Sequence, residues 1–122
     1  MQIKQKTPFQ TFNDGICSIC TLENIAEKGN TPVKGLKKKE ERVPFEKRKV
    51  GIRRFYNAKQ ENAEIEQLIR IPAQFNVSTQ NVCIVGGVQY GIYQVQDVLD
   101  TMPEAKDLSL KRLEEKYELA GI

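Results

Sequence analysis

The sequence predicts a small, mainly β protein: a single-domain β-barrel of about five or six strands. The 122 residues are enough for one domain with a modest core. With five Phe, four Tyr and no Trp, that core must rest on Ile, Val and Leu, and the β-branched residues favour strands. Short apolar runs alternate with turn-forming residues along the chain, and closing such strands into a barrel removes exposed sheet edges.

The first residues predict an arm followed by the first strand of the domain. Residues 1–12 are polar, contain Pro8 and show no steady period, which indicates a flexible N-terminal arm. Asn13-Asp14-Gly15 favours a turn, because Asn and Gly tolerate positive φ. The run 16–22 is rich in Ile, Cys and Thr and predicts a strand. The barrel domain is therefore expected to span 13–122.

Residues 23–44 predict a long loop inserted into the barrel. Turn-forming residues interrupt this stretch too often for a long element. A connection of about twenty residues is unusual in a compact domain and tends to carry function. The interrupting residues are Gly29, Asn30, Pro32, Gly35 and Pro44, and the same stretch carries the lysines Lys34, Lys37, Lys38 and Lys39.

Two further segments follow before the middle of the chain. Residues 45–56 predict a second strand, with Val50 and Ile52 on one face, and 57–62 predict a polar turn or a short helical piece. In 63–71, Ile65, Ile69 and Ile71 share the alternation of a strand, although a helix over 58–71 also fits. The strand is favoured. Pro72 ends the segment in either case.

The last third contains the clearest local signal. The β-rich runs 81–85 and 88–98 flank Gly86-Gly87, which predicts a hairpin with a tight turn, and 101–106 predicts a loop around Pro103. Residues 108–119 remain ambiguous. Leu108 and Leu110 alternate as in a strand, whereas Leu110, Leu113 and Tyr117 keep helical spacing.

The sequence argues against an enzyme, and we expect no cofactor. It has no histidine, the commonest general base at neutral pH, and Gly86-Gly87 does not belong to a phosphate-binding pattern. No nucleophile has a partner that the sequence reveals. We interpret the acidic residues as parts of solvent-exposed faces of the domain; they are Glu61, Glu64, Glu66, Glu114, Glu115 and Glu118.

Cys17-Ser18-Ile19-Cys20 matches the Cys-x-x-Cys pattern, yet we interpret its cysteines as ordinary strand residues. A structural zinc site needs four ligands, and the chain offers only Cys83 in addition and no histidine. A redox pair sits at a helix N-terminus, whereas this pair lies in a predicted strand, where residues three apart face opposite sides. We therefore expect no metal. The odd cysteine count, without a secretory signal, predicts reduced thiols.

Clusters of basic residues are the remaining candidate site. The formal net charge is only +3, but Lys37-Lys38-Lys39 lies in the predicted loop, and a second group lies in or near the second strand. Phe55 and Tyr56 follow that second group, a combination found in single-strand binding grooves. Interleaved glutamates dilute the local charge. The second group supplies the candidates for DNA-phosphate or subunit contact: Lys47, Lys49, Arg53 and Arg54.

No membrane association is expected. No segment approaches the roughly 20 apolar residues that span a bilayer. Residues 1–11 lack the apolar run of a signal peptide, so the chain is expected to start in a cytosol.

An ordered series of short phrases resembles the head-closure proteins (head–tail adaptors or stoppers) of long-tailed bacteriophages and prophages. The phrases cover most of the chain from residue 13 onward. They are Asn13-Asp14-Gly15, Val50-Gly51-Ile52-Arg53-Arg54-Phe55-Tyr56, Leu68-Ile69-Arg70-Ile71-Pro72, Val77-Ser78-Thr79-Gln80-Asn81-Val82, Gln89-Tyr90, Tyr93-Gln94-Val95-Gln96 and Leu108-Ser109-Leu110-Lys111-Arg112-Leu113-Glu114.

The resemblance implies a virion protein made in the host bacterial cytoplasm. Such a protein is a small β-barrel that forms a homo-oligomeric ring, closes the DNA-filled head and docks the tail. Its partners would be a portal-side adaptor above and a tail-completion or tail-tube protein below, with non-specific contact to packaged double-stranded DNA. The resemblance also favours a strand in 108–119. By position, 23–44 would be the channel or gating loop, with Lys34, Lys37, Lys38 and Lys39.

Two alternatives stay open. The first is a single-stranded nucleic-acid-binding barrel that uses Arg53, Phe55 and Tyr56. The second is a tail-completion protein of the same connector.

Overall fold

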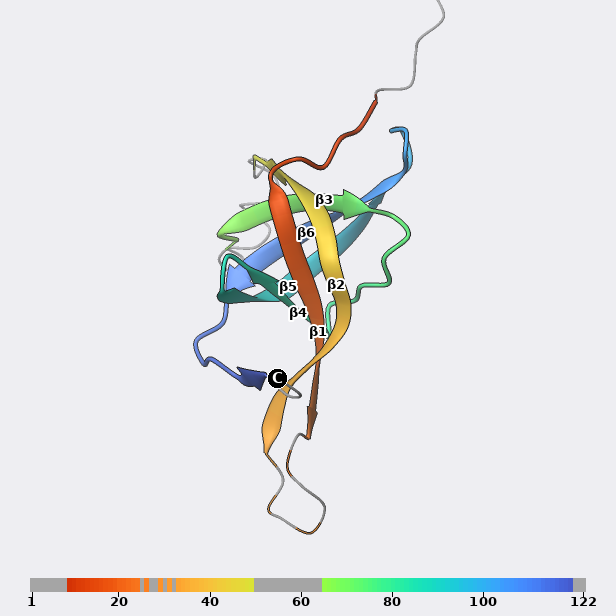
Figure 1. Cartoon of the computed structure of the whole chain (residues 1–122). Coiled ribbons are helices and arrows are strands. Elements are labelled where there is room, and N and C mark those ends of the chain that lie inside the picture. The colour runs from red at the N-terminus through yellow and green to blue at the C-terminus, as the bar shows by residue number, and fades with distance from the viewer. Residues whose placement is uncertain are drawn as a thin grey trace, which may run out of the picture.

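The computed structural model describes residues 9–24, 26, 29, 31, 33–49 and 65–119, and within them the secondary structure is all β (Figure 1). One sheet of seven strands forms in these residues, in agreement with the mainly β single domain that the sequence predicts. The strands are β1 (Gly15–Asn24), β2 (Lys34–Arg48), β3 (Gln67–Pro72), β4 (Val82–Val85), β5 (Val88–Val98), β6 (Ala105–Arg112) and β7 (Glu118–Leu119).

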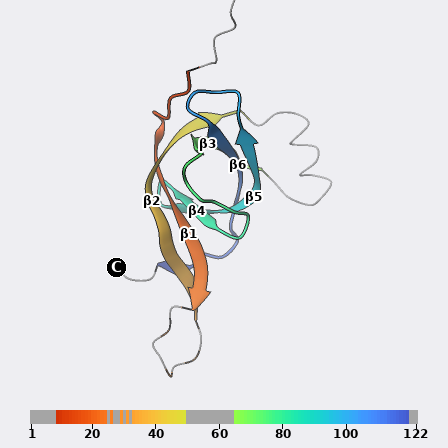
Figure 2. The ribbon, with the colours of Figure 1, turned by 90° about the vertical axis from the view of Figure 1, so that its right-hand side faces the viewer.

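The sheet closes on itself into a ring. Its strand order is β1-β4-β5-β6-β3-β2-β7, and β1 pairs with β2 as well as with β4 (Figure 2). Six strands therefore form the ring, and the short β7 adds to β2 in parallel. Every pairing within the ring is antiparallel. Because β1 pairs with β4 on one side and with β2 on the other, the six strands enclose one contiguous apolar interior.

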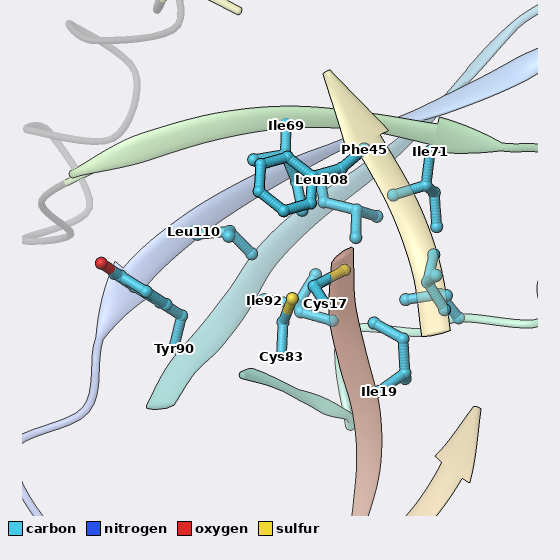
Figure 3. Packing of buried hydrophobic residues seen from close by; sticks show 12 residues of the cluster. Cys17, Ile19, Phe45, Ile69, Ile71, Cys83, Tyr90, Ile92, Leu108 and Leu110 are labelled. Carbon is cyan, nitrogen blue, oxygen red and sulfur yellow. The ribbon is translucent and has the colours of Figure 1, made fainter. Parts of the chain in front are cut away.

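Aliphatic side chains from most strands of the ring fill this interior (Figure 3). Ile69 and Ile71 of β3 alternate inward, as the pleat requires, and are fully buried. They meet Leu108 and Leu110 of β6, which are also fully buried. The core thus rests on Ile, Leu and Val, as the composition predicts.

The hairpin predicted around Gly86-Gly87 is confirmed. β4 and β5 pair directly across the turn, with Val85 opposite Val88. Gly86 and Gly87 have φ values of 58° and 79°, which glycine adopts without a steric penalty.

The long loop predicted for 23–44 is wrong over 34–44, where the chain forms most of β2. In the sequence, Gly35 and Pro44 indicate interruptions of a strand. In the structure, both lie opposite residues of β1 in the antiparallel ladder. Pro44 is tolerated because β3 pairs with β2 only from Glu46 onward, so one edge of β2 is free of described strands at Pro44. Two register shifts bend the pair, and Arg42 adopts φ 54° in this stretch, a backbone that side chains rarely accept outside bulges.

The second predicted strand, 45–56, is confirmed as far as Arg48, while 50–64 lie outside the described residues. Those residues include the predicted turn at 57–62. For 65–71 the strand is confirmed as β3 and the helix is wrong. In 108–119 the strand is confirmed by β6 and by the short β7, and the predicted loop at 101–106 ends where β6 begins at Ala105.

Of the predicted arm, 1–8 lie outside the described residues, and 9–12 follow the domain surface. Phe9 forms a parallel bridge with Met102, and the Gln10 amide donates a hydrogen bond to the Met102 carbonyl at 2.8 Å. Gln10 is buried. Residues 9 and 10 are therefore attached to the domain by backbone contacts with Met102.

Replacing a buried and an exposed leucine by alanine compares what a core side chain and a surface side chain contribute to the free energy of unfolding. Leu108 is 0% exposed in the core, and Leu99 is 70% exposed on the β5–β6 loop. Leu108→Ala is expected to lower the free energy of unfolding by about 2–5 kcal/mol, because it leaves a cavity. Leu99→Ala should change it by less than about 0.5 kcal/mol. Urea unfolding followed by circular dichroism measures both. Equal losses of unfolding free energy in the two variants would contradict the burial of Leu108 in the core.

Candidate functional site

The four lysines predicted on a loop all lie on β2 and are exposed. Lys37 pairs opposite Thr21 and Lys38 opposite Cys20, so the ladder with β1 holds them in place. Lys38 forms an ion pair with Glu41 at 3.6 Å, and the Lys39 amine donates to the Asn81 side chain at 3.3 Å. Lys34 begins the strand. These lysines are therefore fixed on a paired strand.

The second basic group is separated from the first by the length of β2. Lys47 and Arg48 end the strand and Lys49 follows it, all exposed. Arg48 is already paired with Glu46 at 2.6 Å. Arg53 and Arg54 lie outside the described residues, as do Phe55 and Tyr56. The structure thus places the two described groups at opposite ends of one strand rather than in one patch.

The three cysteines are free, buried strand residues, as predicted. Cys17 faces Cys83 in the main core, whereas Cys20 packs in a second cluster with Leu36 and Val82 (Figure 3). A hydrogen bond between the thiols of Cys17 and Cys83, together with burial, raises the pKa of Cys83 well above its usual value. Burial likewise raises the pKa of Cys20. Both thiols therefore stay protonated at neutral pH, and the thiolate is the reactive form.

A nearly buried polar network, which the sequence did not predict, fastens the start of the chain to the ring. Glu46, Arg70 and Asp107 lie side by side in a row across β2, β3 and β6. Arg70 donates two hydrogen bonds to Asp107, at 2.7 and 3.0 Å, and a third to the Gln10 side-chain oxygen at 3.0 Å. Gln10 in turn donates to Glu46 at 2.6 Å. We call these four residues the clasp.

The clasp is a strong arrangement. Its Arg70–Asp107 pair is bidentate, and the two side chains are only 12% and 10% exposed. The bond to Asp107 raises the pKa of Arg70, so the guanidinium keeps its charge at any physiological pH. In the sequence, the only signal was Arg70 between two inward-facing isoleucines, which indicates an outward side chain and nothing about its partners.

Apart from Ile16, which is 62% exposed at the start of β1, large apolar side chains of the described residues are exposed at two separate places. Phe9, Leu99 and Met102 are 80%, 70% and 60% exposed, and all lie on the first described residues or the adjoining β5–β6 loop. Leu22 and Val33 are 37% and 44% exposed where β1 ends and β2 begins. Figures 1 and 2 both show these places at opposite ends of the molecule. Exposed apolar groups of this kind are typical of contact surfaces.

In the described part of the chain no three His, Cys, Asp or Glu side chains gather in a way that could hold a metal ion. Among those residues no helix has the length and apolarity to cross a membrane.

The fold and these surfaces define a class: a small all-β domain whose closed sheet is filled by its own side chains. No protein-family model matches the sequence, and no curated protein matches it significantly.

The clasp can be tested against an exposed ion pair of similar chemistry. Asp107→Asn removes the charge that faces Arg70 and is expected to lower the free energy of unfolding by about 1–3 kcal/mol. Glu66 pairs with Arg112 at 3.4 Å, with side chains 40% and 60% exposed, so Glu66→Gln should cost less than about 1 kcal/mol. Urea unfolding of both variants gives the comparison. A loss for Asp107→Asn no larger than that for Glu66→Gln would contradict the clasp.

Proposed function

We propose that this chain is a structural subunit of a bacteriophage head–tail connector. In this role it forms a ring below the portal and its adaptor, closes the DNA-filled head and offers a surface to the tail. It acts by binding other protein subunits rather than by catalysis, and it belongs to the virion.

The observation that carries the proposal is the exposure of large apolar side chains at two opposite ends of a closed sheet. A subunit placed between two neighbours needs a contact surface at each end. The interior of the ring is packed with aliphatic side chains, so the described interior is a core. Burial against another protein is favourable for these exposed side chains, which are Phe9 and Leu99 at one end and Leu22 and Val33 at the other.

The sequence resemblance supports the same proposal through the placement of its phrases. Leu68-Ile69-Arg70-Ile71-Pro72 lies in β3, Tyr93-Gln94-Val95-Gln96 lies in β5, and the Leu108–Leu110 alternation lies in β6. These three phrases therefore belong to strands of the ring, whereas 77–81 precede β4 and 50–56 lie outside the described residues. Arg70 of the first phrase belongs to the clasp, which gives that phrase a structural role.

The lysines of β2 bear on how such a subunit meets DNA. Lys34, Lys37 and Lys38 are exposed on a paired strand, so they act as fixed charges rather than as a moving gate. Contact of such lysines with packaged double-stranded DNA is non-specific and weakens with salt, because each neutralised phosphate releases counterions.

The proposal is tested in a phage or prophage that encodes the chain. Deleting its coding sequence is expected to yield heads that lose their DNA or fail to join tails, and free tails beside them. Electron microscopy and measurement of infectious yield show this, and mass spectrometry of purified particles should detect the chain in the unaltered phage. Expression of the intact chain from a plasmid is the control and should restore yield. Particles that lack the chain, or a deletion with normal yield, would refute the connector role.

A separate measurement addresses the single-stranded nucleic-acid-binding alternative. Fluorescence titration of the purified chain with labelled single-stranded DNA at near-physiological salt is expected to show binding weaker than about micromolar. Binding that is tighter than this, and insensitive to the substitution Lys34→Gln with Lys37→Gln, would favour a dedicated DNA groove elsewhere in the chain.

A further inference from the structure

One end of the molecule is a two-stranded ribbon. β4 pairs with β1 only at residues 17–20, so 21–24 of β1 are paired only with the first residues of β2 (Figure 2). On its other edge β2 pairs with β7 at Gly35 and Leu36, and Leu36 is fully buried. We call residues 21–24 and 33–37 the ribbon. The Asn24 side chain accepts hydrogen bonds from the amides of Ala26 and Val33, at 3.1 and 3.0 Å, which hold the ends of the two strands together.

The ribbon combines apolar and basic side chains. Leu22 and Val33 are exposed, as are Lys34 and Lys37. By the alternation of the ladder, Lys34 lies on the same face as Leu22 and Lys37 on the other face. Lys38, next along β2, is paired with Glu41. Glu23 is the one acidic residue of the ribbon. Glu118 pairs with Gly35 on the far edge of β2 from β1, away from Leu22.

The opposite end combines apolar and acidic side chains. Residues 97–104, which we call the acidic loop, hold Asp97, Asp100 and Glu104, all exposed, and no basic residue. Between them stand Leu99 and Met102, which are 70% and 60% exposed.

The acidic loop is ordered although its side chains face solvent. The buried Thr101 hydroxyl donates to the Pro103 carbonyl at 2.9 Å, and the Gln10 amide donates to the Met102 carbonyl. The clasp holds Gln10 itself. The loop therefore presents its apolar and acidic groups in a fixed arrangement, which lowers the entropy lost when a partner binds.

We propose that the ribbon of one copy of this chain binds the acidic loop of the next copy. The ribbon and the acidic loop match in both respects that govern association: each exposes two large apolar side chains, and Lys34 and Lys37 of the ribbon are opposite in charge to Asp97, Asp100 and Glu104 of the loop. The partner is a second copy, because one chain carries both halves and bears them at opposite ends, where they cannot meet each other.

Such a contact is heterologous, since it joins two different surfaces. A heterologous contact propagates from copy to copy and closes into a ring when the rotation per copy divides a full turn. The contact deepens the proposed connector function by naming the interface between subunits. It is nevertheless tested on the purified chain, whereas the connector role is tested in the phage particle, so either can fail without the other.

Charge reversal tests the contact. In the ribbon variant, Lys34→Glu and Lys37→Glu make the ribbon acidic; in the loop variant, Asp100→Lys and Glu104→Lys make the loop basic. Each variant alone should associate at least about tenfold more weakly than the unaltered chain, because like charges then face each other. An equimolar mixture should recover association, because every ribbon again finds a loop of opposite charge. Sedimentation velocity over a range of concentrations measures all three samples.

The control variant carries Lys111→Glu and Arg112→Glu, the same charge change at the end of β6, in neither the ribbon nor the acidic loop. It should associate like the unaltered chain. All six substituted residues are exposed, and circular dichroism confirms that each variant is folded. Association of the unaltered chain should also weaken as salt is raised. An unaltered chain that stays monomeric at high concentration, single variants that associate normally, or a mixture that shows no recovery would each overturn the proposal.

Discussion

The pairing of β1 with both β2 and β4 is the constraint on which the rest of the structure depends. Without it, β4, β5, β6, β3 and β2 would form an open sheet with two unpaired edges and an interior open to water. With it, the inward side chains of the ring meet one another, and Ile19 in the middle of β1 is completely buried. Closure of the sheet therefore completes the core.

Closure of a small ring requires bends, and β2 supplies them next to its contact with the middle of β1. The register shifts twice there, Lys39 has no residue opposite it, and Arg42 adopts a left-handed backbone. Bulges of this kind sharpen the twist of a strand. Because they interrupt the alternation of side chains, three consecutive lysines of β2 are exposed. The geometry that closes the sheet thus also determines which charges reach the surface.

Because side chains fill the interior of the ring, contacts with other molecules involve its outer surface and its two ends. The clasp connects these parts, because Gln10 is held by Arg70 and Glu46 and in turn holds the loop at Met102. At the opposite end, Asn24 keeps the strands of the ribbon together. Hydrogen bonds therefore hold both surfaces that we propose for assembly: Gln10 supports the acidic loop from outside it, and Asn24 belongs to the ribbon itself.

Local sequence determined the strand character of 16–22 and the hairpin at Gly86-Gly87, because turn chemistry and side-chain alternation act between near neighbours. Residues 108–112 fitted a strand and a helix equally by local spacing, and the tertiary structure decided for the strand of β6. Only the tertiary structure decided that 34–44 forms a strand, because the local signals at Gly35 and Pro44 indicate breaks and only β1, folded back alongside, provides the missing partner. The tertiary structure also decided the clasp. Its hydrogen bonds join residues that are 36, 37 and 60 positions apart. No local sequence pattern indicates which distant strands a closed sheet brings together.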